Sequence, residues 1–110
     1  MNNESKFAAI KKGLLELAVL RLISRRRVYA ADILAELKAT EFATQEGTLY
    51  PLLSRLCLEN LVGYEWVESA GGPPRKYYSL TQKGRTQLEG LMNYWKELGE
   101  TIEKLGEKIK

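Results

Sequence analysis

An apolar repeat near the C-terminus restricts the fold of this chain more than any other sequence feature. Its seven positions are spaced alternately three and four residues apart between residues 88 and 109, while polar and charged residues occupy most other positions. This spacing predicts one long helix with a narrow apolar stripe, and a stripe of this width needs a partner helix. The seven stripe residues are Leu88, Leu91, Trp95, Leu98, Ile102, Leu105 and Ile109.

Two helices are predicted in the first 40 residues. Helix formers and apolar residues dominate from Phe7 to Ile23, and apolar residues recur at helical spacing from Ala30 to Lys38. Residues 24–28, which include three consecutive arginines, are expected to form the connection between these two helices.

A third helix is predicted before residue 60. Four leucines between residues 49 and 56 fall on one helical face, and Asn60 is a stop signal. Pro51 lies inside this segment and removes a backbone hydrogen bond from any helix that contains it. The helix is therefore either dented at Pro51 or begins near Tyr50, and the sequence leaves both alternatives open.

After Asn60 the apolar period changes from helical to alternating. Residues 62–66 alternate in the manner of a strand, and residues 69–74 are rich in glycine and proline, which indicates a turn. Residues 75–80 are expected to return as a second strand. The resulting two-stranded hairpin needs support from the helices, and Thr81 is a suitable N-cap for the final helix.

The predicted fold is mainly α with a small β-hairpin. Three helices followed by a two-stranded hairpin suit a winged helix-turn-helix, here extended by a long C-terminal helix. We expect a winged-helix domain over residues 1–80 and a helix for dimerisation over residues 81–110. In DNA-binding modules of this type the third helix enters the major groove. The same architecture also serves in protein-interaction modules, so the fold does not decide the function.

Composition argues against catalysis. The 110 residues contain no histidine and a single cysteine, Cys57, which removes the commonest general base and leaves no plausible zinc site. The sequence also lacks a P-loop, a G-x-G-x-x-G run and a G-x-S-x-G elbow. We therefore expect no enzymatic activity, no metal and no cofactor. The absence of a long apolar run or a secretory signal favours a cytoplasmic protein without membrane contact.

Positive charge is concentrated in the first three quarters of the chain. Residues 1–85 carry 13 basic and 9 acidic side chains, a net charge of +4, whereas residues 86–110 carry 4 and 5, a net charge of −1. A surplus of this kind is compatible with a phosphate-binding face. Lys83 and Arg85 also stand at the start of the final helix, where cations oppose the helix dipole. Two cations at this place are a weak indication of an anionic partner.

Candidate DNA-binding residues lie on the outer face of the third helix, at the hairpin tip and at the start of the last helix. Their hydroxyl, amide and cationic groups are those that contact bases and phosphates. A solvated surface carries the same residue types, so this interpretation competes with the functional one. The candidates are Thr44, Gln45, Thr48, Tyr50, Ser54, Arg55, Arg75, Lys76 and Lys83.

Three sequence runs resemble the PadR family of bacterial transcriptional regulators. They are G-T-L-Y-P-L-L-S-R-L at residues 47–56, N-L-V at residues 60–62 and R-K-Y-Y-S-L-T-Q-K-G at residues 75–84. The first helix, with G-L-L-E-L-A-V-L at residues 13–20, is also similar, whereas residues 29–33 depart from the family's usual pattern. The resemblance implies a winged-helix homodimer that binds double-stranded operator DNA, usually as a repressor released by a small molecule.

The short C-terminus resembles the compact branch of this family, in which one long last helix dimerises. In some compact members an aromatic residue of this helix lines a cavity between the subunits and stacks on planar apolar compounds. By this resemblance Trp95 occupies the corresponding position, although packing within a dimer core is a competing role. The expected ligand-binding residues for a small hydrophobic or aromatic effector are Phe7, Ala8, Met92, Trp95 and Gly99.

A second hypothesis treats the chain as a protein-interaction module. In that case the heptad helix binds a different coiled-coil partner, and the winged helix serves as its scaffold. The state of the pure protein in solution separates the two hypotheses, because a stable homodimer favours the regulator and a monomer favours the module.

Overall fold

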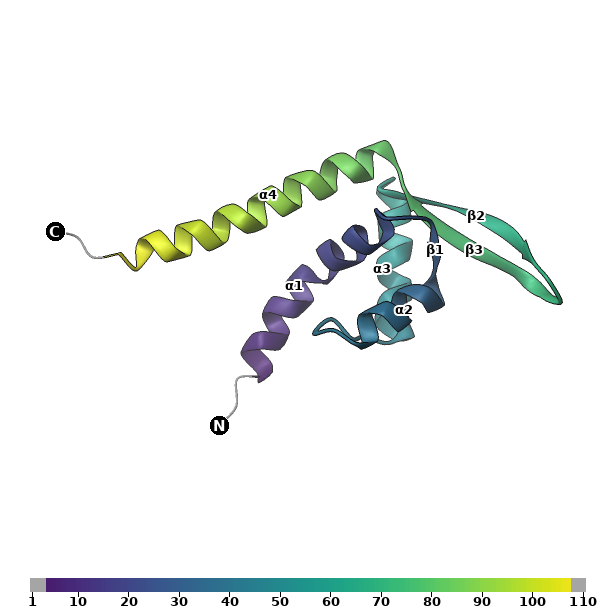
Figure 1. Ribbon diagram of the computed structural model, residues 1–110, viewed down its shortest axis with the longest axis horizontal. Coiled ribbons are helices and arrows are strands. Elements are labelled where there is room, and N and C mark those ends of the chain that lie inside the picture. The colour runs from purple at the N-terminus through teal and green to yellow at the C-terminus, as the bar shows by residue number, and fades with distance from the viewer. Residues whose placement is uncertain (1–3, 108–110) are drawn as a thin grey trace.

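The computed structural model describes residues 4–107, which form four helices and one three-stranded sheet (Figure 1). A helical body of α1, α2 and α3 carries the sheet, and α4 leads away from it. This arrangement confirms the predicted winged helix with a long C-terminal helix. The elements in chain order are α1 (Glu4–Ile23), β1 (Val28–Tyr29), α2 (Ala30–Lys38), α3 (Glu46–Leu58), β2 (Val62–Ser69), β3 (Gly72–Leu80) and α4 (Gln82–Leu105).

The core forms where the three short helices meet the base of the sheet. Apolar residues occupy several sides of α1, because this helix packs against α2, β3 and α4. The leucines of α3 predicted to share one face do face the core, where Leu49, Leu53 and Leu56 are fully buried. Removing these side chains from water is the main source of stability in a domain of this size. Other buried residues are Val19, Leu20, Ile23, Val28, Ile33, Leu37, Leu61, Val62, Tyr78 and Leu88.

The sheet contains one strand more than expected. Residues 24–28 do not form only a connection, because Val28 and Tyr29 pair with Tyr78 and Tyr77 as the short strand β1. The sheet is antiparallel with the order β1-β3-β2. Two residues are too few to produce a periodic pattern, so the sequence carried no signal for this strand.

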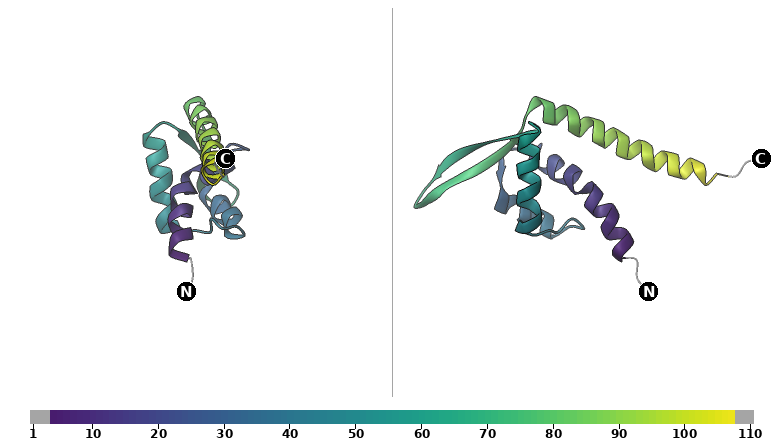
Figure 2. Two further views of the ribbon diagram at one scale, coloured as in Figure 1. Left: turned by 90° about the vertical axis from the view of Figure 1, so that its left-hand side faces the viewer. Right: turned by 180° about the vertical axis from the view of Figure 1, so that it is seen from behind.

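The turn of the hairpin is also shorter than predicted. Strand β2 extends to Ser69 and β3 begins at Gly72, so only residues 70 and 71 connect them, with Gly71 at a φ of 73°. Pro73 and Pro74 therefore belong to the strand. They are tolerated there because β1 pairs only near Tyr77 and Tyr78, which leaves the outer part of β3 with one neighbour. Beyond its base the hairpin projects from the helical body (Figure 2).

Helix α3 contains Pro51 in its interior instead of beginning near Tyr50. The helix starts at Glu46, so the proline lies in its second turn and deprives the Gly47 carbonyl of a donor. At the other end Asn60 adopts a left-handed conformation with a φ of 62°. Hydrogen bonds from Leu61 N to Leu56 O and from Asn60 N to Cys57 O, both 3.0 Å, complete a Schellman motif. The predicted stop at Asn60 is thus confirmed.

The first turn of α4 is anchored to the end of α3. The Thr81 hydroxyl accepts a hydrogen bond from Gly84 N at 2.9 Å, as predicted for an N-cap, and donates one to Asn60 O at 2.7 Å. A Cβ atom on Gly84 would lie 1.9 Å from the carbonyl oxygen of Leu61. Only glycine allows this approach, so Gly84 fixes the direction in which α4 leaves the domain.

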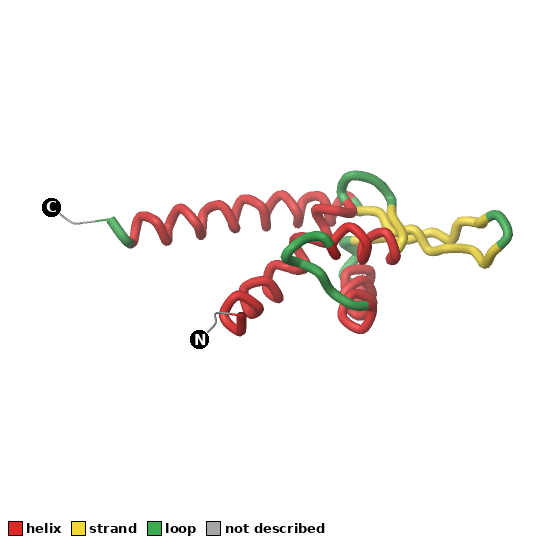
Figure 3. The backbone as a smooth tube through the Cα atoms, turned by 60° about the horizontal axis from the view of Figure 1, so that its bottom comes forward, coloured by secondary structure: helices red, strands yellow, loops and turns green. Residues whose placement is uncertain are grey.

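Most of α4 extends beyond the helical body, away from the hairpin (Figure 3). Leu88 is buried and Leu91 is half-buried against α1, but the stripe from Trp95 to Leu105 is exposed. Ile109 lies outside the described residues. None of the helices within residues 4–107 combines the length and apolar character that crossing a membrane requires.

Candidate nucleic-acid interface

A groove of about 410 Å³ lies between α3 and the hairpin. It brings together four residues predicted from separate segments: Tyr50 and Ser54 from α3, and Arg75 and Lys76 from β3. Among the described residues, no carboxylate lies within 4.0 Å of either cation. The groove therefore presents two positive charges beside two hydroxyl groups, which suits a phosphate backbone. Its other lining residues are Tyr29, Ala30, Ala31, Trp66 and Tyr78.

Aromatic rings position both cations of this groove. The ammonium of Lys76 lies 4.0 Å from the ring centre of Tyr64 and 5.5 Å from that of Trp66. The guanidinium of Arg75 lies 4.7 Å from the ring centre of Tyr29. Cation–π contacts orient a charge without neutralising it, so both groups remain available to an anion.

Two polar groups near Lys76, the Tyr78 hydroxyl and the Cys57 thiol, contribute no charge near neutral pH. Burial raises the pKa of the Tyr78 hydroxyl above its usual range, and burial also raises the pKa of the Cys57 thiol despite the nearby charge of Lys76. Both groups therefore stay protonated, and neither offsets the positive potential of Arg75 and Lys76.

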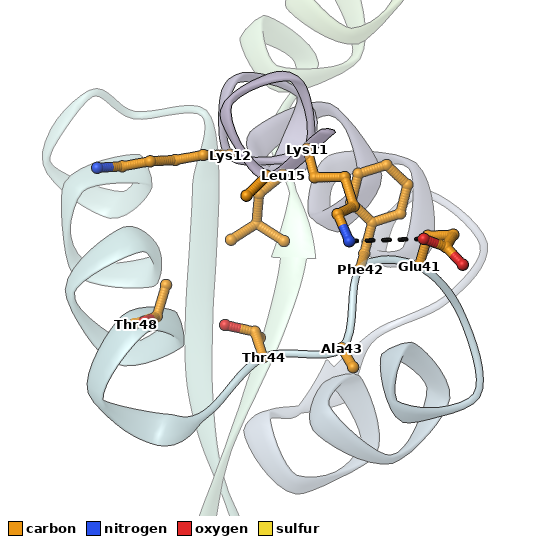
Figure 4. A pocket seen from close by; sticks show the side chains of 9 residues that line it. Lys11, Lys12, Leu15, Glu41, Phe42, Ala43, Thr44 and Thr48 are labelled. Carbon is orange, nitrogen blue, oxygen red and sulfur yellow. Dashed lines mark hydrogen bonds and ion pairs between the residues drawn. The ribbon is translucent and has the colours of Figure 1, made fainter. Parts of the chain in front are cut away.

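A second hollow, of about 400 Å³, lies on the other side of α3 (Figure 4). Thr44 and Thr48, both predicted, line it together with Lys11 and Lys12 of α1. In this view Lys12 and Thr48 share one side, whereas Lys11 pairs with Glu41 at 3.5 Å on the other side. Gln45, the remaining prediction near this end of α3, is exposed at the N-cap position. The α3 N-terminus is thus flanked by hydroxyl groups and by Lys12, which forms no ion pair within the part of the chain that the structure describes.

Arg55 is held away from the hairpin groove by two carboxylates. Its guanidinium lies 2.8 Å from Glu16 of α1 and 3.2 Å from Glu59, the C-cap residue of α3. The hydrogen bond to Glu16, followed by that to Glu59, raises the pKa of Arg55 above its ordinary value. Arg55 therefore lies on the α1 side of α3 with Thr48, and the predicted set divides between two sides of the helix.

Lys83 has a structural partner at the opposite end of α3. Its ammonium donates a hydrogen bond to the carbonyl of Glu59 at 3.1 Å. A cation at the C-terminus of a helix interacts favourably with the helix dipole. Its adverse place at the start of α4 is therefore offset by the favourable contact with α3.

Trp95 lies between two hollows along the α1–α4 junction. One, of about 260 Å³, includes Met92 and Trp95 together with Phe42 and Arg21. The other, of about 300 Å³, is lined by Glu16, Tyr94, Trp95 and Leu98 among others. Of the remaining predicted ligand residues, Ala8 lines the hollow of about 400 Å³ that also contains Lys12 and Thr48. Phe7 and Gly99 line none of the four hollows described above.

With this geometry established, comparison with known proteins identifies the family. Residues 19–90 match the sequence model of the Transcriptional regulator PadR-like family, which covers well over half of the chain. The chain belongs to the PadR-like family. Members are transcriptional regulators that act on DNA, so the groove and the hollow beside α3 lie on a DNA-binding protein.

Solved PadR-like structures share both the fold and the length of this chain. A PadR-like transcription factor from Bacteroides fragilis is 46% identical, with a TM-score of 0.80, over 93% of this chain and 99% of that one. A PadR family transcriptional regulator from Eggerthella lenta is 30% identical, with a TM-score of 0.86, over 96% and 93%. An uncharacterized protein of Lysinibacillus sphaericus is 31% identical over 97 residues, which are 86% of this chain and 89% of the relative.

Sequence reasoning missed three residues that contribute to the candidate interface. Tyr29 and Tyr64 orient cations of the hairpin, and Lys12 reaches the α3 N-terminus from α1. Tyr29 was hidden because β1 was not predicted, and Lys12 because the packing of α1 beside α3 leaves no local pattern. The alternation of Tyr64 with Trp66 was visible in the sequence and could have identified the exposed aromatic face of β2. Residues 4–107 contain no cluster of acidic and cysteine side chains arranged to hold a metal ion.

Proposed function

We propose that this PadR-like protein binds operator DNA as a homodimer and represses transcription until a small apolar effector releases it. In each subunit α3 enters the major groove, and the hairpin contacts the adjacent phosphates or minor groove. The observation that carries this proposal is the groove in which Tyr50, Ser54, Arg75 and Lys76 meet, with no carboxylate of the described residues within 4.0 Å of either cation.

The stripe on α4 supports dimerisation. Four residues of this stripe are between 41% and 79% exposed in a single chain, although they lie on one face of the helix: Trp95, Leu98, Ile102 and Leu105. Isolated stripes of this kind are costly in water, and a second copy of the same helix buries them along the whole length. Two-fold symmetry would also place two α3 helices on one face of the DNA, as an operator with two half-sites requires.

The position of Trp95 supports the proposed binding of an effector. This residue lines the hollows of about 260 and 300 Å³, whose walls are formed mainly by apolar side chains of α1 and α4. Flat apolar compounds bind between aromatic and aliphatic walls of this kind. In the proposed dimer a second Trp95 approaches across the two-fold axis and completes a site for a planar phenolic or hydrophobic molecule.

Fluorescence anisotropy tests the DNA-binding surface. The probe is a labelled duplex that the wild-type protein enriches from random-sequence DNA, titrated at several salt concentrations. Because each phosphate contact contributes about 0.9 to the slope of log K against log salt, Lys76→Ala should flatten the slope by about one and weaken binding about tenfold. Lys96→Ala removes the same charge from α4, away from the groove, and should change neither quantity.

Equal effects of Lys76→Ala and Lys96→Ala would contradict the placement of DNA along the hairpin groove. No preference of the wild-type protein for the enriched duplex over a scrambled one would contradict the proposed function as a whole.

A further inference from the structure

We infer that Glu16 of α1 is a positioning residue that holds Arg55 back from DNA. Glu16 also connects this arginine to the larger of the two hollows beside Trp95, the one of about 300 Å³. The inference deepens the proposed function and depends on it, because it assigns a regulatory link between the effector hollow and the DNA-binding helix. Glu16 does not contact DNA in this scheme; it acts on DNA binding through Arg55.

The Glu16–Arg55 pair is the stronger of the two contacts that hold this arginine. The distance from Arg55 Nη2 to Glu16 Oε1 is 2.8 Å, whereas Arg55 Nη1 lies 3.2 Å from Glu59 Oε2. The Glu16 side chain is 24% exposed and that of Arg55 is 49% exposed, so the carboxylate is the less solvated partner. Partial burial reduces screening by water and strengthens an ion pair relative to a fully exposed one.

The two carboxylates differ in what they connect. Glu59 is the C-cap residue of α3, so it moves together with Arg55 whenever α3 moves. Glu16 belongs to α1, and its contact therefore joins α3 to a different element. Of the two, only the contact with Glu16 makes the position of Arg55 depend on what lies between α1 and α4.

Glu16 also lies in the wall of the hollow beside Trp95. It shares this hollow, of about 300 Å³, with Leu91, Trp95 and Leu98 of α4. An apolar molecule bound there displaces water that solvates the Glu16 carboxylate. Loss of that water lowers the local dielectric constant and tightens the bond between Glu16 and Arg55.

Arg55 cannot serve Glu16 and a phosphate with the same donors. The guanidinium has five N–H donors in a fixed planar fork, and the two carboxylates engage both of its terminal nitrogens. Neutralising Glu16 should therefore release donors toward DNA on the Thr48 side of α3. A tighter Glu16–Arg55 pair should instead withhold these donors and weaken DNA binding. Weaker DNA binding is the effect that release by an effector requires.

Glu16→Gln tests the first half of the inference. With the enriched duplex and anisotropy assay described above, we expect Glu16→Gln to bind three- to tenfold more tightly, with a salt slope steeper by about one. Glu36→Gln is the matched control, since it removes an equal charge and frees Arg25 from a 2.8 Å pair elsewhere. Equal affinities for Glu16→Gln and Glu36→Gln would overturn the inference.

A double-mutant comparison separates an effect through Arg55 from a change in overall charge. In an Arg55→Ala background, Glu16→Gln should no longer increase affinity beyond what Glu36→Gln does in the same background. A gain that persists without Arg55 would refute the positioning role. Circular dichroism of each variant confirms that α-helical content is unchanged.

The neutral fluorescent probe N-phenyl-1-naphthylamine tests the link to the hollow. At a concentration that saturates its fluorescence with each protein, it should weaken DNA binding by wild type and by Glu36→Gln, but not by Glu16→Gln. Equal weakening in all three proteins would overturn the link. If wild type lacks sequence-specific DNA binding, the proposed function fails; if it has such binding and Glu16→Gln behaves as Glu36→Gln, only this inference fails.

Discussion

Truncating Ile102 should weaken the proposed dimer by about two orders of magnitude. Ile102 lies on the α4 stripe and is 68% exposed in the single chain. Replacement by alanine removes three methylene equivalents, or about 2.4 kcal/mol at about 0.8 kcal/mol each when burial is complete. Scaling by the exposed fraction gives about 1.6 kcal/mol per chain and about 3 kcal/mol for two chains, and each 1.4 kcal/mol is a factor of ten.

Sedimentation equilibrium at several loading concentrations measures the dimer dissociation constant directly. Leu58→Ala is the matched control, because Leu58 is 83% exposed but lies at the end of α3, off the stripe. Ile102→Ala should raise the dissociation constant about a hundredfold, and Leu58→Ala should leave it unchanged. A wild-type protein that is monomeric, or an Ile102→Ala variant that dimerises as well as wild type, would refute the reasoning and favour the interaction module.

Three further predictions follow from particular contacts. Gly84→Ala should lower the free energy of unfolding by about 1–3 kcal/mol in a thermal melt, because the new Cβ atom would clash with Leu61 O. Gly90→Ala, whose Cβ atom would meet open space, should raise the free energy of unfolding by up to about 1 kcal/mol. Equal effects of the two substitutions would contradict the role of Gly84. Planar aromatic compounds should quench tryptophan fluorescence in Trp66→Ala but not in Trp95→Ala, and equal quenching in both would exclude the effector hollow. Lys12→Ala should weaken binding to the enriched duplex three- to tenfold and flatten the salt dependence of this binding by about one. Lys96→Ala, measured in parallel, should match wild type. Unchanged binding by Lys12→Ala would show that α1 does not contribute to the interface.

The elements with long periodic patterns were predictable from the sequence. The leucine face of α3, the Asn60 stop and the Thr81 cap were each visible because a local pattern determines them. Strand β1 was not, because two residues pair only after the chain has folded. Pro73 and Pro74 were assigned to a turn because their tolerance in β3 depends on the missing neighbour at the sheet edge.

The sequence identifies candidate site residues by their chemical type, but helical spacing does not show which other elements lie beside them. This spacing places Thr48 and Arg55 on the outer face of α3. The structure adds that α1 passes beside this face and that Glu16 of α1 pairs with Arg55. The sequence predicts Lys83 as a DNA-binding residue, and the structure also gives it a partner within the chain, the carbonyl of Glu59 at the C-cap of α3. Both differences arise from contacts between residues more than 20 positions apart, which no local pattern reports.

The two-fold symmetry of the DNA site tests the central proposal most directly. Sequencing of duplexes that the wild-type protein selects from a random pool should reveal an inverted repeat whose half-sites are about one helical turn apart, as two α3 helices in a dimer require. Enrichment of a single asymmetric half-site, or no enrichment at all, would contradict a homodimeric operator-binding regulator.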